Sequence, residues 1–308
     1  MIFYTVMFQM FSLLIMIGTG YVATKKGMLD NHTNQQMSKM IANVFNPLLA
    51  VSSAAGSVGL ISFELMVKVA EIAVAMFICF IILGMILTPF FTKDNSERKL
   101  YQLMFVFSNL GFIGIPVVST VLGSQYVVYV AEFILIYSIV LYSYGVAVLE
   151  GKFSLKSMKK MINSGTIAGL SAVAIIIFEI RLPEFIGTAV TYLGNVASPL
   201  ALVTVGFNAA QSDLKKIFCQ PKLYIFSVVK LLVIPLLLMP LLHLFKIDGN
   251  TTAVCMIIFG MPVGNMPLIL ANEKGIECFV YSLMIILSTV LCVISIPILL
   301  TLMEMGII

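Results

Sequence analysis

The chain has 308 residues, of which 60% are apolar and only 10% are charged, and its mean hydropathy is +1.09. Soluble domains carry about 25% charged residues, so this composition excludes a soluble globular protein and predicts an integral membrane protein. The net charge is +4.

Ten apolar segments are each long enough to cross a bilayer, which takes about 20 residues. They leave short loops and no room for a soluble domain, and the alternating strands of a transmembrane barrel are missing from the sequence. The basic pair Lys25 and Lys26 follows the first segment, so we expect a retained helix and not a signal peptide. The predicted spans are residues 3–23, 35–55, 65–91, 99–122, 126–149, 162–180, 186–210, 222–245, 250–272 and 276–303.

Lysine and arginine are distributed unevenly over the predicted loops. Fourteen lie in or beside the odd-numbered loops, and three, Lys68, Arg181 and Lys246, lie in or beside the even-numbered ones. Because basic loops stay in the cytoplasm, this bias predicts a multi-pass protein of the cell (inner) membrane with both termini outside the cytoplasm. The positive net charge therefore reports orientation and does not indicate a nucleic-acid partner.

Cysteine and histidine give no sign of a metal site or a disulfide. The five cysteines are scattered and mostly lie within predicted spans, and the two histidines are isolated from each other. We expect free thiols, no bound metal and no cofactor.

The two halves of the chain resemble each other at an offset of 151–152 residues. The segment NVFNPL at Asn43–Leu48 returns as NVASPL at Asn195–Leu200, and Pro116 of span 4 aligns with Pro267 of span 9. The alignment of helix-breaking residues at one offset is a stronger signal than the weak identity between the halves.

Each half contains five predicted spans, in residues 1–150 and 151–308. Since five is odd, the second copy must enter the membrane upside down relative to the first. We therefore predict an all-α polytopic membrane protein whose ten helices form a 5+5 inverted repeat, the arrangement typical of alternating-access transporters.

Spans 4 and 9 are interrupted near mid-membrane by SNLGFIGIP (Ser108–Pro116) and GMPVGNMP (Gly260–Pro267). Unpaired backbone groups cost several kcal/mol in hydrocarbon, so such breaks persist only inside protein or beside a water-filled cavity. We expect the two helices to cross at their breaks, with the half-helices after Pro116 and Pro267 directing their amides at one spot. Neither span contains Asp or Glu, which favours an anionic or neutral solute over a cation.

Three segments carry a resemblance to a known family: NLGFIGIPV, SPLALVTVGFNAA and PLILANEKG with the later STVLCVISIPI. They resemble the auxin efflux carrier family, in its prokaryotic branch of permeases for malonate, malate and other organic acids. The resemblance covers essentially the whole chain. It implies a scaffold of spans 1, 2, 6 and 7, a moving domain of spans 3–5 and 8–10, and a substrate site beside the crossing of spans 4 and 9.

The predicted substrate site contains seven residues at the two breaks and two residues on the scaffold side that precede the prolines of spans 2 and 7. An alternative for the asparagines at the breaks is that they only cap the ends of half-helices. The nine residues are Asn109, Gly111, Gly114, Pro116, Pro262, Asn265, Pro267, Asn46 and Ser198.

Three ionisable residues within spans are candidates for ion coupling. Glu71 follows Lys68 by three residues, so an interfacial ion pair is its alternative. For Glu132 the alternative is a satisfied polar contact. Lys230 is expected to balance the charge of the substrate, to pair with Glu71 or Glu132, or to extend its ammonium toward the membrane surface.

Together these features predict a secondary transporter, not an enzyme, for small organic anions such as mono- or dicarboxylates or auxin-like weak acids. Its partners are the anion and the lipid bilayer. A sodium-coupled symporter of the bile-acid type is the alternative; a channel or a membrane enzyme is less favoured, since no catalytic cluster is found. The sequence leaves open a coupling proton, a coupling sodium or neither, and whether the protein is a homodimer.

Overall fold

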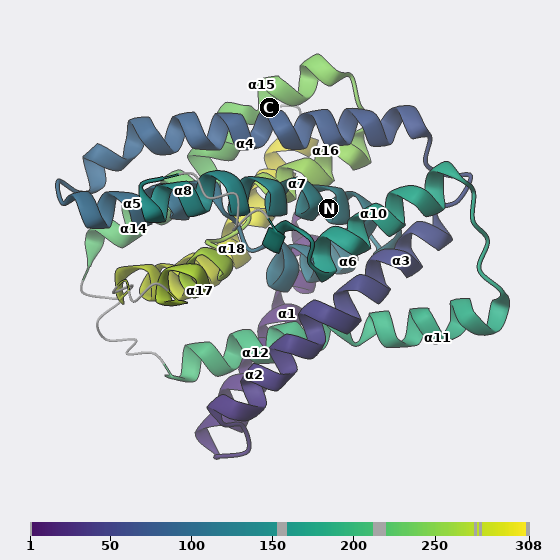
Figure 1. The fold of residues 1–308 in the computed structure, drawn as a ribbon, viewed down its shortest axis with the longest axis horizontal. Coiled ribbons are helices and arrows are strands. Elements are labelled where there is room, and N and C mark those ends of the chain that lie inside the picture. The colour runs from purple at the N-terminus through teal and green to yellow at the C-terminus, as the bar shows by residue number, and fades with distance from the viewer. Residues whose placement is uncertain (1, 153–158, 212–219, 274–275, 277–278, 306–308) are drawn as a thin grey trace.

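The computed structural model describes residues 2–152, 159–211, 220–273, 276 and 279–305. Within these ranges the chain is helical and contains no β-strand, apart from one isolated bridge (Figure 1). The expected all-helical membrane class is confirmed. The α-helices are α1 (Ile2–Lys25), α2 (Asn31–Met40), α3 (Asn46–Gly56), α4 (Phe63–Phe91), α5 (Asn95–Val106), α6 (Ile115–Val121), α7 (Val127–Val140), α8 (Val146–Glu150), α10 (Ser164–Ile177), α11 (Glu184–Asn195), α12 (Ala197–Gln211), α14 (Pro221–Val228), α15 (Ile234–Phe245), α16 (Gly249–Phe259), α17 (Met266–Glu273) and α18 (Phe279–Glu304).

The long apolar helices match the predicted spans. Among the described residues, six helical runs are long and apolar enough to cross a membrane: Val6–Lys25, Phe63–Phe91, Ser124–Glu150, Glu184–Gln211, Pro221–Phe245 and Phe279–Glu304. Three shorter apolar helices, Leu110–Val121, Ser164–Ile177 and Gly249–Phe259, fall in predicted spans 4, 6 and 9. Predicted span 2 overlaps α2 and α3. The ten-span inverted repeat and its division at residue 150 remain predictions.

Wide π-helical turns allow three of the helices to accommodate proline. The turns Ile41–Phe45, Leu110–Gly114 and Val229–Val233 lead directly into Pro47, Pro116 and Pro235. In each case the residue before the proline donates its amide to the carbonyl five residues back: Asn46 to Ile41, Ile115 to Leu110, and Ile234 to Val229. Proline lacks an amide and clashes with the preceding turn, and the wider turn relieves that clash. The chain from α2 to α3 therefore continues through Pro47 without a break.

Two glycines allow α1 and α12 to pack closely. A Cβ atom at Gly20 would lie 2.1 Å from the Val203 carbonyl oxygen, and one at Gly206 would lie 1.9 Å from the Ile17 carbonyl oxygen. Small residues at a helix–helix contact of this kind are the main means of close packing in membranes. The contact joins the first predicted span to the seventh.

An aromatic cluster joins α4, α5 and α14. The rings of Phe105 and Phe226 lie 4.4 Å apart between centroids, and Phe91 packs against both at 5.7 and 5.3 Å. Tyr101 stacks on Phe91 at 5.7 Å. Such pairs add to the apolar burial, and they hold the end of α5 against α14.

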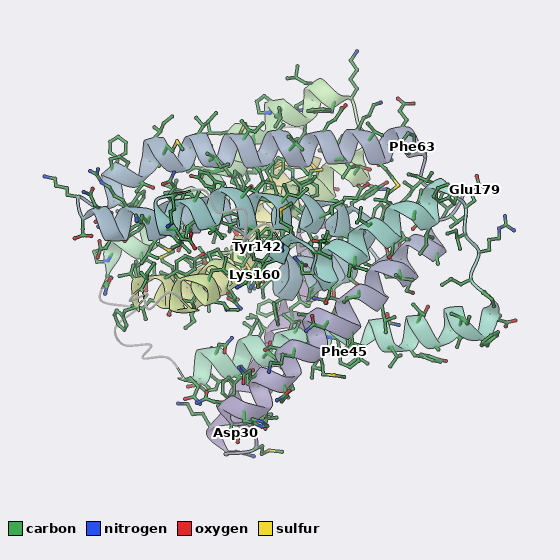
Figure 2. All side chains as sticks on the ribbon, in the orientation of Figure 1. Asp30, Phe45, Phe63, Tyr142, Lys160 and Glu179 are labelled. Carbon is green, nitrogen blue, oxygen red and sulfur yellow. The ribbon has the colours of Figure 1, made fainter. Side chains whose placement is uncertain are left out.

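Figure 2 places Phe63, from the second predicted loop, and Glu179, from the end of predicted span 6, toward the same end of the molecule. Asp30, from the first predicted loop, lies away from that end. Which end faces the cytoplasm remains a prediction. Several of the basic residues that underlie it fall outside the described residues, namely Lys156, Lys215, Lys216 and Lys274.

Three of the five cysteines can be assessed in the structure. Cys79, Cys255 and Cys292 are free thiols, as expected. Cys219 and Cys278 lie outside the described residues.

We predict that Gly20→Ala lowers the melting temperature of the purified protein, because its methyl group would collide with the Val203 backbone. Gly18→Ala, on the same helix, is the matched control, since nothing lies within 4 Å of the added atom. Replacing a helical glycine by alanine gains about 1 kcal/mol of helix propensity, so the control should melt at or above the wild-type temperature. Equal melting of the two variants would contradict close packing of α1 on α12.

Candidate functional site

Both predicted helix breaks are present in the structure. Span 4 is broken between the end of α5 at Val106 and the π turn that begins at Leu110, and span 9 between Phe259 and Met266. The expectation that the second half of span 4 starts after Pro116 is wrong. The π turn accommodates Pro116 inside the half-helix, so the break lies earlier, at residues 107–109.

The two breaks pair with each other through their backbones. The amide of Asn109 donates to the Pro262 carbonyl at 2.8 Å, and the amide of Gly264 donates to the Phe107 carbonyl at 2.9 Å. Ser108 and Val263 form an isolated antiparallel bridge between these bonds. Each break therefore supplies the hydrogen bonds that the other has lost, which hydrocarbon could not do. We call residues 107–109 and 260–265 the paired breaks.

Close approach and neighbouring side chains hold the paired breaks in place. A Cβ atom at Gly264 would lie 2.7 Å from the Ser108 carbonyl oxygen, so the chains meet at this distance only with glycine there. From α18, the Ser288 hydroxyl accepts the Val263 amide at 3.1 Å, and the Tyr281 hydroxyl donates to the Gly264 carbonyl at 3.2 Å.

The asparagines at the breaks cap a helix and also carry unused polar atoms. Asn109 accepts the Phe112 amide through Oδ1 at 3.2 Å, so it caps the half-helix that begins at Leu110. Its side chain is only 4% exposed, and Nδ2 has no partner among the described residues. Asn265 is partly buried, and its Oδ1 likewise has none there. Rotating an amide group exchanges its donor and acceptor, so both side chains can offer an N–H to a ligand.

The two predicted scaffold residues, Asn46 and Ser198, lie on elements that contact the second half of span 4. Asn46 donates from Nδ2 to the Gly111 carbonyl at 3.2 Å, which joins span 2 to the second half of span 4. Ser198 lies near the start of α12, a helix that packs against the Leu110–Gly114 turn and α6. Within the described part of the chain, Asn46 Oδ1 and Ser198 Oγ are buried without a partner.

The remaining predicted site residues shape the backbone. Pro116, Pro262 and Pro267 are buried, as is Gly114. Pro262 supplies a carbonyl to the bridge, and Pro267 is the second residue of α17, where its missing amide leaves no helical hydrogen bond unmade.

Lys230 reaches the paired breaks from span 8. Its side chain is 0% exposed, and Nζ donates to the Phe105 carbonyl at 2.7 Å and to Ser108 Oγ at 2.9 Å. Nζ also lies 4.2 Å from the centroid of the Phe80 ring. The expected ion pair with Glu71 or Glu132 is wrong, and so is the expected extension toward the surface. The contacts of Lys230 could not be predicted, because the sequence gives no direct sign of which carbonyls a helix break exposes.

The two glutamates differ in their surroundings. Glu71 is exposed, and Lys68 pairs with Glu64 at 2.8 Å, so the expected Lys68–Glu71 pair is wrong. A glutamate four residues before a lysine is the better helical pairing. Glu132 is buried at 3% exposure, and its Oε2 has no partner in the described residues.

A family comparison agrees with this arrangement. The family model described as "Membrane transport protein" matches residues 5–165 and 153–300, nearly the whole chain. The chain belongs to this family of membrane transporters. The resemblance to auxin efflux carriers is thereby confirmed at the level of the family, and the protein is a multi-pass membrane transporter. A search among curated proteins gives no match.

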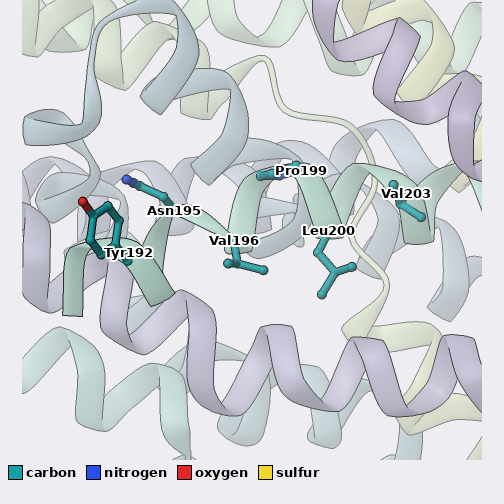
Figure 3. Close-up of a pocket in the computed structure, with 6 residues that line it drawn as sticks. All are labelled: Tyr192, Asn195, Val196, Pro199, Leu200 and Val203. Atoms are coloured by element: carbon teal, nitrogen blue, oxygen red, sulfur yellow. The ribbon is translucent and has the colours of Figure 1, made fainter. Parts of the chain in front are cut away.

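A depression on the surface of this transporter is lined by none of the residues of the paired breaks. It is a shallow, open depression with a volume of about 380 Å³, and it is formed where α11 meets α12 (Figure 3). Its lining is mostly apolar and does not include Ser198. We therefore place the candidate site at the paired breaks, where Asn109 and Asn265 each carry an unpartnered polar atom among the described residues. The lining residues are Tyr192, Asn195, Val196, Pro199, Leu200 and Val203.

We predict that Ser288→Ala lowers the free energy of unfolding by about 1–3 kcal/mol, because the buried Val263 amide loses its acceptor. Ser295→Ala is the matched control on the same helix, since that buried hydroxyl bonds only to the Cys292 carbonyl within α18. Thermal unfolding of both variants in detergent is the measurement. A loss for Ser295→Ala as large as that for Ser288→Ala would show that the hydroxyl of Ser288 does not support the paired breaks.

Proposed function

We propose that the protein is a secondary transporter of small organic anions, mono- or dicarboxylates, that works by alternating access. The unpartnered, buried Nδ2 of Asn109 is the observation that carries this proposal. A buried donor without an acceptor is costly, and a ligand carboxylate at the paired breaks would supply the acceptor.

The charges around the paired breaks also favour an anion. The second halves of both broken spans begin there, at Leu110 and Met266, and the start of a helix carries partial positive charge. The buried ammonium of Lys230 bonds to Ser108, the neighbour of Asn109. Neither broken span contributes a carboxylate within its predicted length. An anion would therefore meet fixed dipoles and one positive charge, with no negative group of spans 4 and 9 to repel it.

Alternating access is supported by the antiparallel pairing of the breaks, which is what two inverted copies of one motif would give. In this proposal residues 1–150 and 151–308 are the two copies, Asn46 and Ser198 line the scaffold side, and Asn109 and Asn265 bind the carboxylate. We place the protein in the inner membrane with both termini outside the cytoplasm, and in the organic-acid branch of its family.

A thermal-shift screen of the purified protein against mono- and dicarboxylates tests the site. A ligand that binds the folded state raises the melting temperature. We expect a carboxylate to stabilise the wild type and to lose this effect in Asn265→Ala and in Asn109→Asp. The aspartate keeps an oxygen that can cap Phe112, but it removes the donor and repels an anion.

Asn250→Ala is the control for this screen, because Asn250 is an exposed asparagine in the first turn of α16. It should respond to the carboxylate as the wild type does. Full stabilisation of Asn265→Ala and Asn109→Asp by the same carboxylate would place the site elsewhere.

We further propose Glu132 as the group that couples transport to protons. A buried carboxyl without a cationic partner is a candidate proton carrier in a membrane protein, and among the described residues Glu132 meets this description. In liposomes, Glu132→Gln should abolish proton flux that accompanies substrate uptake. The exposed Glu71 serves as control, and Glu71→Gln should behave as the wild type. Unchanged proton flux in Glu132→Gln would remove this role.

A further inference from the structure

The surroundings of Lys230 are those of a bound cation. An ammonium group has three N–H donors, and three electron-rich groups surround Nζ: the Phe105 carbonyl, the Ser108 hydroxyl and the face of the Phe80 ring. None of them carries a negative charge. Among the described residues, no carboxylate forms an ion pair with Lys230.

The position of Nζ is also one where transporters bind ions. Phe105 is the last residue but one of α5, so its carbonyl belongs to the turn that lacks partners within the helix. The C-terminal end of a helix carries partial negative charge. In ion-coupled transporters with broken helices, unwound carbonyls and the C-terminal ends of half-helices coordinate the coupling cation. Lys230 occupies the equivalent position at the end of the first half of span 4.

We propose that the Lys230 ammonium is a built-in cation that takes the place of an exchangeable coupling ion at the paired breaks. The inference rests on the proposed function, because it assigns the charge that faces the transported anion. Lys230 is a positioning residue: it acts through Ser108 on the break that contains Asn109. The substrate anion then binds at the paired breaks without a coupling cation. A monovalent cation can bind there only after the lysine is removed.

Lys230→Gln tests this inference, with Lys222→Gln as the matched control. Lys222 lies at the start of the same predicted span and is exposed. Melting temperatures are compared in sodium chloride and in N-methylglucamine chloride at equal ionic strength, with no carboxylate present. The wild type should have the same melting temperature in both salts, and so should Lys222→Gln. Lys230→Gln should melt lower than the wild type in N-methylglucamine and rise by about 2 °C or more in sodium.

Two results of this comparison would overturn the inference. One is stabilisation of the wild type by sodium, which would mean that an ion site is already open. The other is a sodium response of Lys230→Gln no larger than that of the wild type. Since this arm contains no carboxylate, its failure is distinct from failure of the proposed function, which would appear as the lack of any carboxylate effect on the wild type.

A second arm uses the carboxylate that stabilises the wild type. Its apparent affinity for Lys230→Gln should fall by about tenfold or more in N-methylglucamine, because a nearby positive charge is gone, and should recover in sodium. Unchanged affinity would overturn the inference.

Ser108→Ala covers the case in which Lys230→Gln does not fold. This variant removes one of the three groups around Nζ and retains the ammonium. We expect weaker carboxylate binding and no response to sodium; wild-type affinity, or a sodium response, would contradict the proposed role.

Discussion

The structure depends on one constraint, that no backbone amide or carbonyl can be left unpaired inside the membrane. Two predicted membrane spans are interrupted partway along their length, and each interruption supplies hydrogen bonds to the other. The bridge between Ser108 and Val263, with its two flanking hydrogen bonds, makes the two breaks a single unit. Ser288, Tyr281 and the absence of a side chain at Gly264 then fix this unit against α18.

The same constraint explains why polar groups gather at the paired breaks. Once the backbone is unwound, side chains such as Asn109 and Lys230 find carbonyls and amides that a regular helix would have occupied. A site built in this way is pre-organised, because its dipoles are held by the fold and do not reorient when a ligand arrives. The membrane therefore favours a compact polar centre over polar groups spread along the helices.

The sequence predicted the parts of this arrangement that depend on composition and on helix breakers. The spans, the two interrupted helices and the asparagines at the breaks followed from hydropathy and from proline and glycine. The partners of the charged residues did not. Lys230 binds a carbonyl and a hydroxyl 125 and 122 residues away in sequence. Lys68 forms its ion pair with Glu64, four residues before it, and not with Glu71, three residues after it. Proline was also a poor guide to the exact point of the break in span 4, because the π turn before Pro116 accommodates the ring and shifts the interruption to Ser108.

Those π turns have a geometric consequence. A π turn holds one more residue than an α turn, and each residue of an α-helix advances the side chains by about 100°. Conversion of Val229–Val233 to regular α-helix would therefore rotate one end of its span against the other by about that angle. Lys230 lies inside this turn, so a change of a single hydrogen-bond register would swing its ammonium away from Phe105 and Ser108. In span 8, the point at which such a rotation would occur is therefore the turn that contains Lys230, the residue that binds the paired breaks.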